Sequence, residues 1–174
     1  MEGHIRLTDF GLSKDGITGP GAEGGTKTFC GTPEYLAPEI LDNKGHGKGV
    51  DWWSFGTLLY EMLCGLPPFY DTNVQKMYHK ILCAPLRFPS YLSDEAKDIL
   101  RGLLQRKVEE RLGSGPGGTS EVKAADFFKS LDFDRVMAKV RFSDVNVGTS
   151  FCARFCMREG IAIFSLHSLA RRRP

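Results

Sequence analysis

The most constraining feature of the sequence is an apolar stretch over residues 50–64, which reads VDWWSFGTLLYEMLC. A helix with so few polar positions around its circumference is predicted to be buried at the centre of a domain rather than to lie on its surface. Gly65, Pro67 and Pro68 follow at once and are expected to end it. The chain of 174 residues is therefore expected to form a mainly helical domain around this segment.

Further helices are predicted after this one. A helix over residues 73–82 is expected to begin with a capping box, in which Thr72 and Gln75 each satisfy a free amide of the first turn. Another is predicted to run from Ser93 to about residue 105, because a hydroxyl cap and early acids suit the positive end of a helix. Its inward face is expected to consist of four apolar residues, Ile99, Leu100, Leu103 and Leu104. A short helix is predicted near residues 124–128.

The two ends of the chain are expected to be less regular. Residues 5–8 alternate apolar and polar, which is typical of a short half-buried strand. Residues 9–32 show no periodicity, and a loop of that length in a compact domain is usually functional or disordered. Residues 140–174 carry six arginines against two acids. They are expected to be a poorly ordered basic tail that follows a domain over residues 1–139.

The net charge and the cysteine content limit the cellular compartments and the classes of binding partner that this chain is expected to have. The net charge of +2 is too small to indicate nucleic acid as a partner. Five cysteines without a C-x-x-C pair indicate a reduced, cytoplasmic setting rather than a disulfide framework. The run Arg171 to Arg173 leaves a nuclear location as an alternative, although a solvated chain end is the simpler explanation. No apolar stretch reaches the roughly 18 residues of a membrane span, and no secretory leader is recognisable at the start.

An ordered set of motifs follows the predicted strand. Asp9-Phe10-Gly11 comes first, then GTPEYLAPE at residues 31–39, VDWWSFG at residues 50–56 and RLG at residues 111–113. This order resembles the signature of protein kinases, in which D-F-G and A-P-E bracket an activation loop. The wording TFCGTPEYLAPE is similar to the AGC branch of serine/threonine kinases, near protein kinase B and the serum- and glucocorticoid-induced kinases. The resemblance covers about residues 3–139.

The resemblance implies a partial kinase fold: the large C-terminal lobe only, mainly α, with a short β remnant at the N-terminus. It also implies ATP-dependent phosphorylation of serine or threonine in proteins. Asp9 would hold Mg²⁺ on the phosphates of ATP, since magnesium prefers hard oxygen ligands. Phe10, beside Gly11, is expected to pack into the core and keep Asp9 in place. A strand-end cap is the alternative role for Asp9, and the downstream motifs argue against it.

Thr28 matches the activation-loop phosphorylation site of the family, which an upstream activating kinase would modify. Phosphate adds roughly −1.5 to −2 charges and orders a loop only where cations meet it. Lys14 matches one such cation, whereas the arginine of the family's catalytic loop has no counterpart in this sequence. An unmodified surface threonine is the alternative for Thr28.

Several residues of the GTPEYLAPE run and its neighbour match positions beside the substrate. By resemblance, Phe29, Pro33 and Leu36 would line the pocket next to the residue that is phosphorylated, and Thr32 would steady the catalytic aspartate. Simple packing is the alternative for the three apolar residues, and both interpretations can hold at once.

Glu61 is unusual on physical grounds. It is an acid near the C-terminal end of an apolar helix, where the helix dipole disfavours negative charge and an unpaired buried carboxylate is unfavourable. It is therefore expected to have a cationic partner. The matching glutamate of the family binds an arginine just upstream of the target residue, which implies protein substrates with basic residues there. An internal salt bridge is an equal alternative.

Three further residues match structural positions of the family. Glu39 and Arg111 match an ion pair that ties the end of the activation loop to the later helices. Asp51 matches an acid at the start of the central helix that accepts hydrogen bonds from the backbone of the catalytic loop.

Several parts of the kinase machinery do not occur among the 174 residues. There is no V-A-I-K lysine, no H-R-D base and no catalytic-loop asparagine, and eight residues precede Asp9. Phosphoryl transfer depends on positioning and charge neutralisation. This chain alone is therefore expected to be an inactive kinase fragment that binds no ATP or magnesium tightly. The alternative is a non-catalytic kinase-like module that binds basic peptides or protein partners.

Two G-x-G-x-x-G matches, at residues 19–24 and 113–118, are interpreted as flexible loops. A kinase glycine loop lies between two strands and has a valine two residues after its last glycine, and neither match does. The tail over residues 140–174 also lacks the Thr-Pro turn motif and the F-x-x-F motif of AGC kinases. The end of the chain is therefore expected to differ from that of the family.

Overall fold

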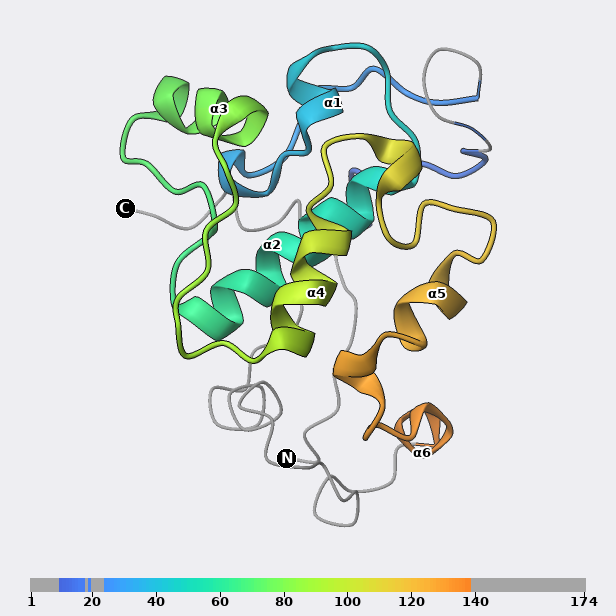
Figure 1. Ribbon diagram of the computed structural model, residues 1–174. Helices are drawn as coiled ribbons and strands as arrows, with labels where there is room; N and C mark the ends of the chain where they lie inside the picture. The colour runs from blue at the N-terminus through green and yellow to red at the C-terminus, as the bar shows by residue number, and fades with distance from the viewer. Residues whose placement is uncertain (1–9, 18, 20–23, 139–174) are drawn as a thin grey trace.

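The computed structural model describes residues 10–17, 19 and 24–138, and these form a helical domain (Figure 1). Its elements are the 3₁₀ helix η1 (Pro33–Tyr35), α1 (Pro38–Leu41), α2 (Gly49–Cys64), α3 (Val74–Cys83), α4 (Asp94–Leu103), η2 (Val108–Glu110), α5 (Thr119–Lys123), η3 (Asp126–Phe128) and α6 (Phe133–Met137). The described residues contain no strand, and an isolated antiparallel bridge joins Thr26 to His46. The mainly helical class is thus confirmed for these residues, and the strand predicted over residues 5–8 lies outside them.

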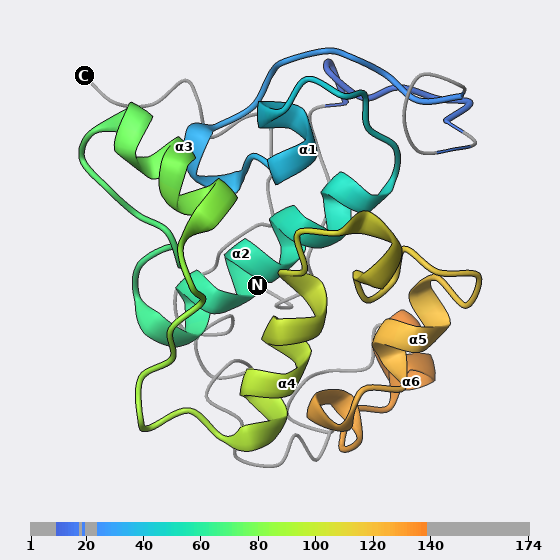
Figure 2. The ribbon, with the colours of Figure 1, turned by 45° about the horizontal axis from the view of Figure 1, so that its top comes forward.

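Helix α2 lies at the centre of the described chain, with α4 beside it and α1 and α3 toward its other side (Figures 1 and 2). Within residues 50–64 every residue except Asp51 is at least partly buried, which confirms the prediction of a central helix. The helix ends at Gly65, whose backbone is left-handed with φ 87° and whose N–H donates to the carbonyl of Glu61 at 2.7 Å. Glycine adopts this conformation without the strain that a side chain would add.

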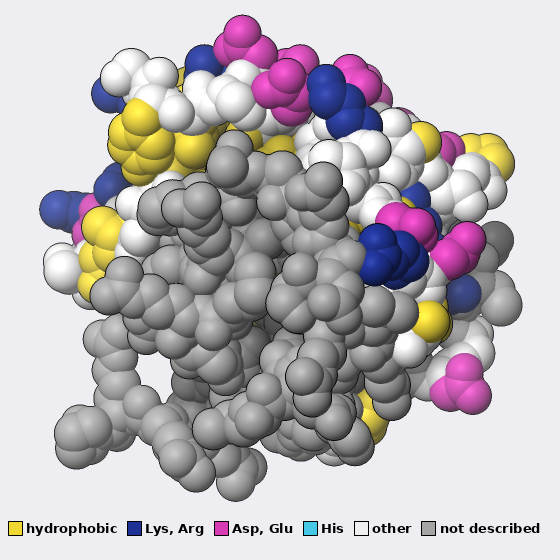
Figure 3. Space-filling view, turned by 90° about the horizontal axis from the view of Figure 1, so that it is seen from below, with side chains coloured by type: hydrophobic (Ala, Val, Ile, Leu, Met, Phe, Trp, Pro, Cys, Tyr) yellow, Lys and Arg dark blue, Asp and Glu magenta, His cyan; other side chains and the backbone are white. Residues whose placement is uncertain are grey.

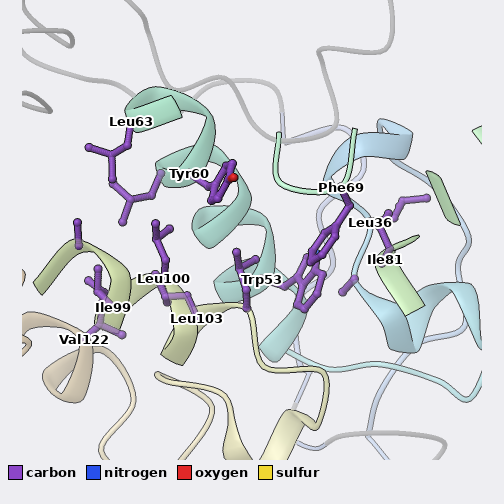
Figure 4. Close-up of a cluster of buried hydrophobic side chains, with 14 of the residues drawn as sticks. Leu36, Trp53, Tyr60, Leu63, Phe69, Ile81, Ile99, Leu100, Leu103 and Val122 are labelled. Atoms are coloured by element: carbon purple, nitrogen blue, oxygen red, sulfur yellow. The ribbon is translucent and has the colours of Figure 1, made fainter. Parts of the chain in front are cut away.

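A glycine lets α4 approach α2 closely. A Cβ atom at residue 56 would lie only 2.8 Å from the Cβ atom of Leu103, so a larger residue than Gly56 would push the helices apart. The inward face of α4 includes Ile99, Leu100 and Leu103, all buried as predicted, and they meet the side chains of α2 (Figure 4). Each fully buried side chain of this kind contributes roughly 1.5–3 kcal/mol. The domain is therefore held together chiefly by this contact.

The starts of α3 and α4 show side-chain caps. Ser93 accepts a hydrogen bond from the first turn of α4 at 3.3 Å, as predicted. The cap of α3 is Asn73 and not Thr72, so that prediction is wrong: the Asn73 side chain accepts from the N–H of Lys76 at 3.0 Å. With Asn73 as the cap, the third helical position is Lys76 rather than Gln75, and a capping box cannot form.

The short elements after α4 differ most from the sequence prediction. The helix predicted near residues 124–128 is the shorter 3₁₀ helix η3, and α5 and α6 were not predicted. Helices of five residues contain too few positions to display a 3.6-residue period. An edge-to-face contact joins η3 to α6, since the ring centroids of Phe128 and Phe133 lie 5.8 Å apart, and Phe128 also meets Phe127 within η3 at 5.0 Å.

Charged side chains of both signs are mixed on the surface. In Figure 3, basic and acidic side chains of the described residues lie next to one another along the rim of the molecule. Pairs such as Arg101–Asp98 at 2.6 Å and Lys107–Glu110 at 2.7 Å are exposed, and such pairs contribute about 0–1 kcal/mol each. None of the described helices combines the length and the apolar character that crossing a bilayer requires.

Candidate functional site

The first described residues form an exposed turn. The backbone N–H and the hydroxyl of Ser13 both donate to the carbonyl of Phe10, at 3.0 and 2.6 Å. The Phe10 side chain is 65% exposed, so the expectation that it packs into the core is wrong for this chain. The buried cluster gathers around α2 and α4 and does not extend to residue 10. Gly11 is exposed in the same turn, and Asp9 lies outside the described residues.

Lys14 and Thr28 lie together on the surface. The Lys14 ammonium donates to the hydroxyls of both Thr26 and Thr28. The backbone of Thr26 in turn pairs with that of His46 in both directions, at 2.9 and 2.8 Å, which anchors this loop to the segment before α2. Burial lowers the pKa of His46 below its ordinary value, so its imidazole is neutral at pH 7. Any phosphate on the exposed Thr28 would therefore meet the charge of Lys14 first.

Helix α2 holds Tyr35 at two points. The Tyr35 hydroxyl donates to the carboxylate of Glu61, and the Ser54 hydroxyl donates to the Tyr35 carbonyl at 3.0 Å. Ser54 and Glu61 lie two turns apart on one face of α2. Burial, together with the hydrogen bond and charge of Glu61, raises the pKa of Tyr35. The phenol therefore keeps its proton and remains a donor to Glu61.

The observed partner of Glu61 is thus a neutral hydroxyl. The ion pairs of the described residues do not include Glu61, so the internal salt bridge considered for it is absent there. Its other predicted partner, an arginine of a substrate, stays a prediction. Sequence reasoning missed Tyr35 and Ser54, although a buried tyrosine in a motif should have indicated a hydrogen-bond partner for its hydroxyl.

The predicted pocket residues lie in different environments. Phe29 is 56% exposed and its ring meets that of Tyr78 on α3 edge-on, with centroids 6.4 Å apart. Pro33 is partly buried at the start of η1, whereas Leu36 belongs to the buried cluster. Leu36 therefore packs in the core, whereas more than half of the Phe29 side chain is open to solvent. The Thr32 hydroxyl is buried without a hydrogen-bond partner among the described residues.

A buried ion pair joins the end of the GTPEYLAPE run to the segment after α4. The two terminal nitrogens of Arg111 donate to the two carboxylate oxygens of Glu39 at 2.7 and 2.9 Å, which is the bidentate geometry that makes such pairs strong. Arg111 also donates to the carbonyls of Gln105 and Gly49, at 2.8 Å each, and its Cζ lies 5.2 Å from the centroid of the Trp53 ring. With its side chain fully buried, Arg111 needs this complete set of partners.

The remaining predicted residue, Asp51, lies in the first turn of α2 with its side chain exposed. No group of three or more histidine, cysteine, aspartate or glutamate side chains among the described residues could hold a metal ion.

Comparison with known proteins identifies the family. The protein kinase domain matches residues 1–128 of the chain. Among curated proteins the chain is 59% identical over 138 residues to Protein kinase 2 of Dictyostelium discoideum. The aligned residues make up 79% of this chain and 28% of that protein. It is 55% identical to the serine/threonine-protein kinase gad8 of Schizosaccharomyces pombe, over 79% of this chain and 23% of that protein. It is 48% identical to the human RAC-beta serine/threonine-protein kinase, over 79% of this chain and 28% of that protein.

These matches fit the order of the motifs and the helical architecture around α2. The chain spans less than a third of the length of the relatives named. The resemblance to serine/threonine kinases of the AGC branch is confirmed by their high identity. The chain belongs to the protein kinase domain family.

Proposed function

We propose that residues 1–139 supply the large-lobe part of an ATP-dependent serine/threonine protein kinase, with its activation segment and its peptide-docking surface, and that residues 140–174 form a separate basic tail. The observation that supports this most is the state of Glu61. Its observed partner, Tyr35, is neutral, so the negative charge of the carboxylate is left uncompensated among the described residues. An arginine of a peptide substrate would compensate it with a charge-assisted hydrogen bond.

In the whole enzyme, some of the residues that catalysis needs are proposed to lie in this chain and others are not among its 174 residues. Protein kinases use ATP with Mg²⁺ to transfer the terminal phosphoryl group, and Asp9 is the residue proposed to hold the metal. The Thr32 hydroxyl, which has no partner within the ranges that the structure describes, fits a residue that donates to a catalytic aspartate. That aspartate, the ATP-binding lysine and the glycine-rich loop do not occur in the 174 residues. A polypeptide of these residues alone is therefore proposed to be inactive.

Thr28 is proposed as the site that an upstream kinase phosphorylates. The hydroxyl is exposed and already within hydrogen-bonding distance of the Lys14 ammonium. A phosphate there would replace one neutral contact with an ion pair, and would draw Lys14 and the bridge between Thr26 and His46 into one ordered cluster. In the intact enzyme this would fix the activation segment.

A transfer assay tests the proposal. The purified 174-residue chain is incubated with Mg²⁺, ATP labelled in its terminal phosphate and a peptide that carries arginine upstream of a serine. No transfer above background is expected, and Asp9→Ala is expected to be indistinguishable from the wild type. Transfer by the pure chain that Asp9→Ala abolishes would overturn the proposed division of the chemistry.

The second candidate is a binding module without catalysis, located in the cytoplasm or the nucleus. The uncompensated carboxylate of Glu61 and the exposed ring of Phe29 favour it for this polypeptide. Fluorescence anisotropy with the same labelled peptide distinguishes the two: saturable binding by the pure chain supports the module, whereas a folded chain that binds no peptide argues against it.

A further inference from the structure

Arg106, in the segment after α4, fastens the C-terminal end of α3. Its Nε donates to the carbonyl of Ile81 at 2.8 Å, and its Nη2 donates to the carbonyls of Lys80, at 3.3 Å, and Ala84. The last carbonyls of a helix lack partners within the helix and lie at the negative end of its dipole. The guanidinium of Arg106 therefore supplies both hydrogen-bond donors for these carbonyls and a positive charge at the negative end of the α3 dipole. None of the sequence motifs includes Arg106.

The Arg106 guanidinium also lies at one end of a series of contacts between buried rings and guanidinium groups. The Cζ of Arg106 lies 5.3 Å from the centroid of the Phe69 ring, and Phe69 stacks on Trp53 at 5.9 Å with planes 11° apart. Figure 4 shows these two rings against each other beside α2. Arg111 then lies against Trp53, and its carboxylate partner is Glu39. The series thus connects the end of α3 to the ion pair of the activation segment through side chains that are almost fully buried.

Helix α3 carries Tyr78, one of the two aromatic residues that meet at the proposed peptide-docking surface; the other is Phe29. Tyr78, which meets Phe29 edge-on, lies one turn before Ile81, whose carbonyl Arg106 binds. Helix α3 also lies against η1 and α1. A loss of order at the C-terminal end of α3 would therefore move Tyr78 relative to Phe29.

We propose that Arg106 is a positioning residue for the substrate-facing surface: it fixes α3 on the buried series and so holds Tyr78 against Phe29. Arg106 itself need not touch a peptide. The role of Phe29 in binding rests on the proposed function, whereas the anchoring of α3 by Arg106 does not. The two parts are tested by separate measurements on the full 174-residue chain.

The first measurement is hydrogen–deuterium exchange. Arg106→Ala is expected to accelerate exchange in residues 74–84 by about tenfold, because the end of the helix loses its cap, while α2 and α4 keep their protection. Arg106→Lys keeps the charge but not the planar guanidinium. Its exchange rate in residues 74–84 is expected to lie between those of the wild type and Arg106→Ala. The matched control is Arg101→Ala, since Arg101 also faces a ring, Phe88, at 5.2 Å, and donates to Asp98 within α4 rather than to α3. Residues 74–84 are expected to be unchanged in it.

Unchanged exchange of residues 74–84 in both Arg106 variants would overturn the proposal. So would a uniform rise across α2, α3 and α4, because that result indicates a general stability role. If Arg106→Ala does not fold, Arg106→Lys decides the question in the same way.

The second measurement compares two peptides that differ only in the residue after the target serine, phenylalanine in one and alanine in the other. The wild type is expected to prefer the phenylalanine peptide, and Arg106→Ala to reduce that preference severalfold while the dependence on the upstream arginine is retained. If the wild type binds neither peptide, the proposed function fails and the exchange result still decides the role of Arg106. An undiminished preference in Arg106→Ala would contradict the link between α3 and Phe29.

Discussion

The core around α2 and α4 and the loop over residues 24–31 are held in opposite ways. In the core, Trp53 and Leu100 are fully buried, and the charge of Arg111 is matched by bidentate and carbonyl partners. The loop is held by the contacts of Lys14 and by the bridge between Thr26 and His46. The side chain of Phe29 in the loop, and those of Phe10 and Leu12 in the segment before it, are more than half exposed.

This difference predicts that the two regions contribute unequally to the stability of the domain. Segments with few buried contacts open at low free energy, and elements that switch or bind are drawn from that end of the range. This contrast supports the proposal that the loop responds to a phosphate on Thr28 while the core keeps Glu61 and α3 in place. Substitutions in the core should change the free energy of unfolding, and substitutions in the loop should not.

The largest effect is expected for Arg111→Ala. It leaves the buried carboxylate of Glu39 without its partner, and removing one member of a buried pair costs about 3–5 kcal/mol. Urea denaturation followed by circular dichroism measures the loss. The control Arg101→Ala removes an exposed pair and is expected to cost no more than about 1 kcal/mol. Equal losses in the two variants would contradict the contrast between buried and exposed pairs.

A smaller loss is expected for Leu100→Ala. Leu100 is fully buried between α4 and α2, and deleting such a side chain costs about 2–5 kcal/mol through lost burial and the remaining cavity. Leu12→Ala removes the same atoms from a side chain that is 51% exposed, and is expected to change the free energy of unfolding by less than about 0.5 kcal/mol. A loss for Leu12→Ala near that for Leu100→Ala would show that the segment before the loop is packed as tightly as the core.

A gain is expected for Thr57→Val. The Thr57 hydroxyl is buried in α2 and has no hydrogen-bond partner in the described part of the chain, and such a group costs about 1–3 kcal/mol. Replacing it with a methyl group of similar size is expected to stabilise the domain by about 1 kcal/mol. Thr57→Ala, which also removes volume, serves as the control and should not stabilise. A loss of stability in Thr57→Val would indicate that the hydroxyl has a partner after all.

The smallest effect concerns pH. Because burial lowers the pKa of His46 in the folded state, the unfolded state binds a proton first as the pH falls through about 6.5. His46, whose charged neighbours are Lys14, Glu39 and Asp51, is therefore expected to lower the free energy of unfolding progressively below that pH. His46→Gln should flatten the change in urea midpoint between pH 7.5 and 5.5. The exposed His79 provides the control, and equal slopes for His46→Gln and the wild type would contradict this role.

The sequence predicted the parts of the fold that depend on local composition. Residues 50–64 could be recognised as a central helix because their apolar character is continuous, and Ser93 because a cap acts within four residues. The contacts of Tyr35 with Ser54 and Glu61, and of Arg106 with α3, join residues 19 to 26 positions apart. No periodicity encodes such contacts. Phe10 was mispredicted for the same reason, since its burial depends on what packs over it and not on its own chemistry.

The most direct test of the account is a double-mutant cycle between Glu61 and a peptide. Binding of a peptide with arginine just upstream of its serine is measured for the wild type and for Glu61→Gln, each also with the arginine replaced by alanine. Gln keeps an acceptor for the Tyr35 hydroxyl, so the variant removes charge without releasing Tyr35. A coupling of roughly 1–3 kcal/mol between the carboxylate and the arginine is expected. Additive losses, with no coupling, would contradict it.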